Sequence, residues 1–120
     1  MKKILFLLCI SGSLSTSAIT YTSTLGYFNA TMVSDCTPAT VTFTSFTAPV
    51  GTVSKKIDFV DGTPLTPFPG ATINHVYTIA NEYDVFILYF DAGGSNIGYE
   101  YCRIEIYGQP GNVVNVYGAP

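Results

Sequence analysis

The sequence contains no tryptophan, one histidine and few charged residues, which make up 11% of its 120 positions. Five residues are Lys or Arg and eight are Asp or Glu. Two of the five stand at the extreme start, so the rest of the chain carries only Lys55, Lys56 and Arg103 as cations. Binding to a phosphate backbone requires clustered Lys and Arg. We therefore expect no nucleic-acid partner.

The sequence also lacks an apolar run long enough to span a bilayer, which takes about 20 residues. The run at residues 4–10 (ILFLLCI) follows Met1-Lys2-Lys3 and precedes small polar residues up to Ala18. This order is typical of a secretory signal peptide. We expect residues 1–18 to be removed and the mature chain, with no membrane span, to be secreted to the exterior or the periplasm. The alternative is that the run forms a buried first strand.

Cysteine is scarce: of three cysteines, Cys9 lies in the predicted signal peptide, and Cys36 and Cys102 remain. An even number of cysteines in an exported chain favours a disulfide. In the chain-entropy model, closing this loop would stabilise the fold by about 4 kcal/mol. A metal or nucleophile pair is the alternative, but two thiols do not complete a zinc site, which takes four ligands. We therefore expect a Cys36–Cys102 disulfide, no metal and no cofactor.

Helical periodicity is missing from the whole chain, whereas short strand-like segments recur about every ten residues. They are rich in β-branched and aromatic residues, and turn residues such as Asp61-Gly62 separate them. The expected strands cover residues 40–47, 53–60, 71–79, 83–90 and 98–107. Residues 63–70 (TPLTPFPG) contain too much proline for a central strand. This pattern predicts an all-β sandwich or barrel.

Three stretches of the chain occur in the order and spacing of a known family. They are residues 41–45 (VTFTS), 57–63 (IDFVDGT), and 74–77 (NHVY) followed by 83–87 (YDVFI). Together they resemble a PKD domain over residues 39–108. The resemblance implies an all-β, immunoglobulin-like, two-sheet antiparallel sandwich of the PKD type. The family's usual Trp and Gly are replaced here by Ile57 and Val60, and the Gly before Tyr83 by Asn81-Glu82.

The acids and the histidine of these stretches invite a catalytic interpretation. Asp58 and Asp61 lie three residues apart on a strand that ends in a turn, so they do not share a face. We expect Asp61 to cap the turn and Asp58 to accept nearby backbone donors. By the resemblance His75 is structural, and the family's calcium-binding loop corresponds to residues 48–52, which contain no acid.

The strand at residues 83–90 (YDVFILYF) is apolar on both faces. The resemblance places Tyr83, Val85, Ile87 and Tyr89 inward. The opposite face, where the family usually has small polar residues, then carries Phe86, Leu88 and Phe90, with Tyr99 and Tyr101 on the next strand. An exposed apolar face of this kind usually marks a contact surface. The alternative is that residues 19–35 of the same chain cover it.

We therefore expect a signal peptide at residues 1–18, an N-terminal segment or edge strand at 19–34, a PKD-like sandwich at 35–109 and a tail at 110–120. The predicted function is an exported binding or adhesion module that contacts an extracellular protein or glycan through Phe86, Leu88, Phe90, Tyr99 and Tyr101. The alternative is a structural subunit that self-associates through the same face. No motif combines nucleophile, base and oxyanion donors, so no enzyme is expected.

Overall fold

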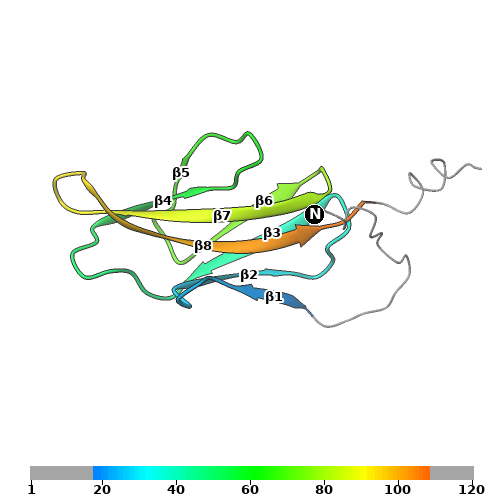
Figure 1. Cartoon of the computed structure of the whole chain (residues 1–120), viewed down its shortest axis with the longest axis horizontal. Coiled ribbons are helices and arrows are strands. Elements are labelled where there is room, and N and C mark those ends of the chain that lie inside the picture. Colours follow the sequence, from blue (N-terminus) through cyan, green and yellow to red (C-terminus); the bar gives the residue numbers. More distant parts are fainter. Residues whose placement is uncertain (1–17, 109–120) are drawn as a thin grey trace, which may run out of the picture.

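The computed structural model describes residues 18–108 (Figure 1). The predicted signal peptide, apart from Ala18, and the predicted tail lie outside the described residues. Within them the chain forms eight strands and no helix, which confirms the expected all-β class. The strands are β1 (Ile19–Thr22), β2 (Phe28–Met32), β3 (Ala39–Ser45), β4 (Ser54–Asp58), β5 (Thr66–Pro67), β6 (Thr72–Tyr77), β7 (Asn81–Phe90) and β8 (Asn96–Ile106).

The strands form two four-stranded antiparallel sheets that pack as an immunoglobulin-like sandwich (Figure 1). One sheet has the order β1-β2-β3-β6 and the other β5-β4-β7-β8. The proline-rich connection contributes only the two-residue β5 at a sheet edge, where a missing N–H is tolerated. The strongest predicted strand, β7, lies in the interior of its sheet between β4 and β8, because it is apolar on both faces.

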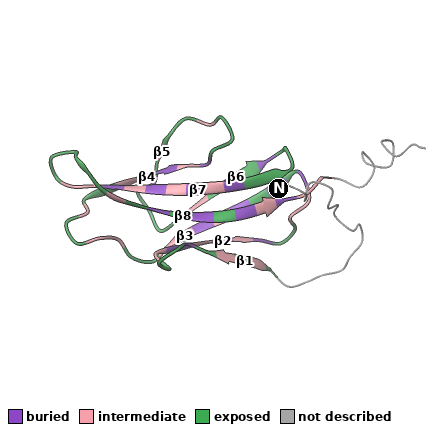
Figure 2. Cartoon of the chain, in the orientation of Figure 1, coloured by how far each residue is buried: buried purple, intermediate pink, exposed green. Residues whose placement is uncertain are grey.

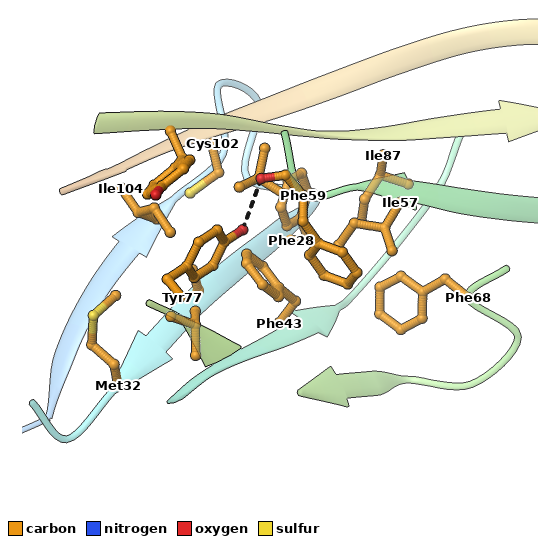
Figure 3. Packing of buried hydrophobic residues seen from close by; sticks show 14 of the residues in the cluster. Phe28, Met32, Phe43, Ile57, Phe59, Phe68, Tyr77, Ile87, Cys102 and Ile104 are labelled. Carbon is orange, nitrogen blue, oxygen red and sulfur yellow. Dashed lines mark hydrogen bonds between the residues drawn. The ribbon is translucent and has the colours of Figure 1, made fainter. Parts of the chain in front are cut away.

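The core lies between the sheets and is built by alternation along each strand (Figure 2). On β7 the buried residues are Tyr83, Val85, Ile87 and Tyr89, which confirms the predicted inward set. Figure 3 shows aromatic rings packed between the two sheets, where the Phe43 ring contacts those of Phe28 and Phe59. Tyr77 is fully buried, and its hydroxyl donates a hydrogen bond to the Phe59 carbonyl oxygen at 3.0 Å.

The N-terminal segment, predicted as a separate segment or an edge strand, is part of the sandwich. Residues 19–32 form a hairpin in which β1 is an edge strand and β2 pairs with β3. Phe28, Ala30 and Met32 of β2 point into the core. The described sandwich therefore begins at Ile19, earlier than the expected boundary at residue 35.

The predicted disulfide between Cys36 and Cys102 is wrong, because Cys102 is a free thiol. Cys102 pairs with Val85 and points into the core, and burial raises the pKa of its thiol to about 12. Cys36 instead lies opposite Tyr107, five residues after Cys102. At about 3.3 Å per residue, this separates the two cysteines by about 16 Å along the strand direction. A disulfide tolerates Cα atoms no more than about 7 Å apart.

The turn after β4 contains the one non-glycine residue with a positive φ among residues 18–108, Val60 at 54°. A left-handed conformation costs an L-residue about 1–2 kcal/mol, while glycine in place of a side chain costs about 0.5–1 kcal/mol in chain entropy. We expect Val60→Gly to raise the free energy of unfolding by about 0.5–1 kcal/mol, measured by urea denaturation.

Val76→Gly is the matched control for this prediction. Val76 is also an exposed valine, but it lies within β6, where its φ is not positive. There glycine relieves no strain, and we expect a loss of about 1 kcal/mol. If Val60→Gly destabilises the protein as much as Val76→Gly, the strain at Val60 is not real.

Candidate functional site

The candidate site is the outer face of the sheet β5-β4-β7-β8. Strand pairing places Phe86 opposite Tyr101 and Leu88 opposite Tyr99. Phe90 continues the row on β7, so the structure brings together the five residues predicted from the sequence. We call Phe86, Leu88, Phe90, Tyr99 and Tyr101 the aromatic patch.

Phe86 lies at the centre of the patch, between two tyrosine rings. Its ring centroid is 5.7 Å from that of Tyr99 and 5.6 Å from that of Tyr101, with tilted planes. Both distances fall in the range in which aromatic rings attract one another. Phe86 is half-buried by this packing, whereas Tyr99 is 63% exposed and Tyr101 36% exposed. The phenylalanine thus supports two tyrosines that face solvent.

Charged side chains stand at both ends of the patch. Next to Tyr101, Arg103 donates two hydrogen bonds to the carboxylate of Asp84, at 2.7 and 3.2 Å. Near the other end, the Lys56 ammonium lies 5.4 Å from the centroid of the Phe90 ring. A cation over a ring face is attracted by the ring quadrupole. The patch is therefore an apolar strip with polar groups at either end that could orient a ligand.

The N-terminal segment does not cover this face, which excludes the alternative that residues 19–35 bury it. β1 and β2 pair in the opposite sheet, and Figure 1 shows them away from β7. The turn between them reaches the edge of β8, where the Thr24 amide donates to the Tyr101 carbonyl oxygen at 3.0 Å. This contact uses the backbone at the sheet edge. The ring of Tyr101 stays partly exposed.

The residues singled out near the turn after β4 have packing roles. The Asp58 carboxylate accepts the Val60 amide and that of Asp61 accepts the Thr63 amide, as expected. His75 Nε2 lies 2.7 Å from Asp61 Oδ2, and the His75 ring stacks on Phe59 at 3.8 Å. Burial raises the pKa of Asp61, but the hydrogen bonds from His75 and Thr63 outweigh it and leave the pKa below its usual value. The sequence did not indicate the His75–Asp61 pair.

Glu100 is a second residue whose role was missed. It is 1% exposed, and its Oε2 accepts hydrogen bonds from Ser23 Oγ at 2.6 Å and from the amides of Leu25 and Tyr27 at 2.5 and 3.3 Å. This carboxylate therefore holds the β1–β2 turn against β8. Burial, and to a lesser degree the charge of Glu100, raises the pKa of the nearby Tyr89 to about 12. Alternation along β8 placed Glu100 inward, which was the available signal.

Among residues 18–108, no group of three or more His, Cys, Asp or Glu side chains is placed to hold a metal ion. The same part of the chain contains no helix that is long and apolar enough to cross a membrane. No family model, no curated protein and no solved structure matches this chain. The resemblance to PKD domains therefore stays a prediction from the sequence.

Proposed function

We propose that this protein is an exported binding module that contacts an extracellular protein or glycan through the aromatic patch. The observation that carries the proposal is Tyr99, which lies on the edge strand β8, is 63% exposed and packs against Phe86 on an uncovered sheet face. Large aromatic side chains carry much of the binding energy of an interface. A partner that covers these rings removes their apolar surface from water, which is favourable. Rings that neighbouring side chains already hold in place also lose little conformational freedom on binding.

The sequence resemblance supports the same proposal from another direction. PKD domains usually carry small polar residues where this chain has Phe86, Leu88 and Phe90. Aromatic residues on a solvent-facing sheet contribute nothing to the core, whose inward set is complete without them. The departure from the family pattern thus favours a contact role for this face, with either a protein or the apolar faces of sugar rings.

The test removes the exposed rings and leaves the supporting ones. We expect Tyr99→Thr/Tyr101→Thr to weaken partner binding about tenfold or more, because aromatic anchors dominate interfaces. Folding should change little, since both residues point to solvent and threonine suits a strand. Binding is measured with a glycan array and a surface pull-down using the full chain, and folding with a thermal melt.

The control is Val76→Thr/Ile79→Thr, which removes two exposed apolar side chains away from the patch. This variant should bind like the wild type. Equal binding by the tyrosine variant and the wild type would sink the proposal. Size-exclusion chromatography separates the second candidate: a concentration-dependent oligomer that the tyrosine variant loses identifies a structural subunit, in which copies meet through the patch.

A further inference from the structure

A hollow of about 540 Å³ lies beside the aromatic patch. It is lined by the loop before β4 (residues 48–53), by the first residues of β4, and by residues 67–69 after the short β5. Its volume falls within the range of about 300–1,000 Å³ that is typical of small-ligand pockets. The walls are largely apolar, with Pro49, Pro67 and Phe68 among them.

The charge of this hollow is of one sign. Lys55 and Lys56 line it, and no Asp, Glu or His does. They are two of the three lysines and arginines in residues 18–108, and the third, Arg103, is paired with Asp84. Within that part of the chain neither lysine forms an ion pair. The unneutralised positive side chains of this acidic protein are therefore concentrated at one site.

Lys55 is held in place by partners that carry no negative charge. Its Nζ donates to the Gly70 carbonyl oxygen at 3.0 Å and lies 4.6 Å from the centroid of the Phe68 ring. Burial lowers the pKa of this ammonium, because part of its water shell is replaced by apolar surface. A carbonyl dipole and a ring quadrupole compensate for this loss only in part. An anion in the hollow would supply the missing counter-charge.

Lys56 links the hollow to the aromatic patch: Lys55 and Lys56 are consecutive on β4, so their side chains point to opposite faces, and that of Lys56 lies on the face of the patch. This residue lines the hollow and pairs in register with Leu88, and its Nζ lies over Phe90. We propose that the hollow is an anion subsite that binds the carboxylate of an acidic glycan whose neighbouring sugar rings contact the aromatic patch. The inference rests on the proposed function in that one ligand spans both surfaces.

A glycan fits this place better than an acidic peptide. Peptides often bind a sheet by adding a strand to a free edge. Here β4 is paired on both sides, with β7 along its length and with β5 at Lys56 and Ile57. At the hollow, a ligand therefore meets the face of the sheet rather than a free edge of β4. Sugar rings can do so by placing their C–H faces against aromatic rings, while a uronate carboxylate reaches the Lys56 ammonium at the rim of the hollow.

The test compares three polymers by isothermal titration calorimetry with the full chain: alginate, a polyuronate; dextran, which is uncharged; and poly-glutamate, an acidic peptide. We expect alginate to bind more tightly than both others. Its affinity should fall steeply from about 0.1 M to about 1 M salt, since the Debye length shrinks from about 10 Å to about 3 Å. Lys56→Gln should weaken alginate binding about fivefold, whereas Lys56→Arg should retain it.

Two further variants control for stability and for net charge. Lys55→Gln/Lys56→Gln should lose more affinity for alginate than Lys56→Gln. A thermal melt checks that the double variant still folds without the hydrogen bond from Lys55 to Gly70. The single variant leaves that bond intact, so it decides the matter if the double variant unfolds. Thr40→Glu, on the exposed outer face of β3 in the opposite sheet, changes the net charge by the same amount as Lys56→Gln and should bind like the wild type.

The failures of the two proposals can be told apart. If alginate and dextran bind equally and Lys56→Gln binds like the wild type, while the tyrosine variant loses binding, the anion subsite is overturned and the proposed function stands. Preference for poly-glutamate overturns the glycan assignment. Failure of both acidic polymers to bind overturns the subsite outright, and the pull-down with the tyrosine variant then decides the proposed function by itself.

Discussion

Phe43→Ala is expected to lower the free energy of unfolding by about 3–5 kcal/mol, the range measured for removal of a buried aromatic ring. Phe43 is fully buried on the middle of β3, with the rings of Phe28 and Phe59 at 6.5 and 5.7 Å. Phe28 lies on β2 of the same sheet, and Phe59 directly follows β4 of the opposite sheet. The cavity left by the missing ring can therefore close only if the two sheets move relative to one another. Urea denaturation measures the loss. The slope of the free energy of unfolding against urea concentration should stay unchanged.

Thr40→Ala is the control for this prediction. Thr40 lies on the same strand but is exposed on its outer face. Its replacement should change the free energy of unfolding by no more than about 0.5 kcal/mol. A loss below about 1 kcal/mol for Phe43→Ala would mean that the two sheets do not meet at this residue.

Glu100→Ala is expected to destabilise the protein by about 2–4 kcal/mol, because it leaves donors without an acceptor. Three of them converge on Glu100 Oε2: the Ser23 hydroxyl and the amides of Leu25 and Tyr27. The β1–β2 turn should then open before the rest of the sandwich. Hydrogen exchange should show this as faster exchange at Leu25 and Tyr27, with little change in β3 and β7.

Glu100→Gln tests whether the acceptor or merely the volume of the side chain matters. Glutamine keeps one carbonyl oxygen of nearly the same shape, so it should cost less than alanine and protect the two amides partly. If alanine and glutamine destabilise equally, or if exchange at Leu25 and Tyr27 is unchanged in both variants, Glu100 does not hold the turn.

Most of the sheet pattern was predictable from local residues. Alternation divided residues 83–90 into two faces, and the resemblance to PKD domains correctly placed Tyr83, Val85, Ile87 and Tyr89 on the inward one. The Pro-rich stretch correctly excluded a central strand. Asp61-Gly62 marked the turn, where Gly62 adopts a φ of 98°. Such features depend on the two-residue period of a strand and on backbone sterics, both of which act over a few neighbouring residues.

The errors concern pairs of residues that are distant in sequence. Counting cysteines predicted a Cys36–Cys102 disulfide, yet the strand register separates the two positions. The N-terminal residues 19–34 were expected to form a separate segment or an edge strand, and they supply both the edge strand β1 and the neighbouring β2. Composition and count carry no information on register, which is set by how whole strands pack against one another.

The sequence by itself determined the all-β class, the inward face of β7 and the five residues of the aromatic patch, because side-chain alternation and the resemblance to PKD domains are both read from short stretches of sequence. Only the tertiary structure decided that the patch is open, that Glu100 anchors the turn 77 residues away at Ser23, and that Lys55 and Lys56 border a hollow without a carboxylate. Each of these depends on which strands become neighbours. That choice is made by burial of the whole core at once, so no single segment of the sequence contains it.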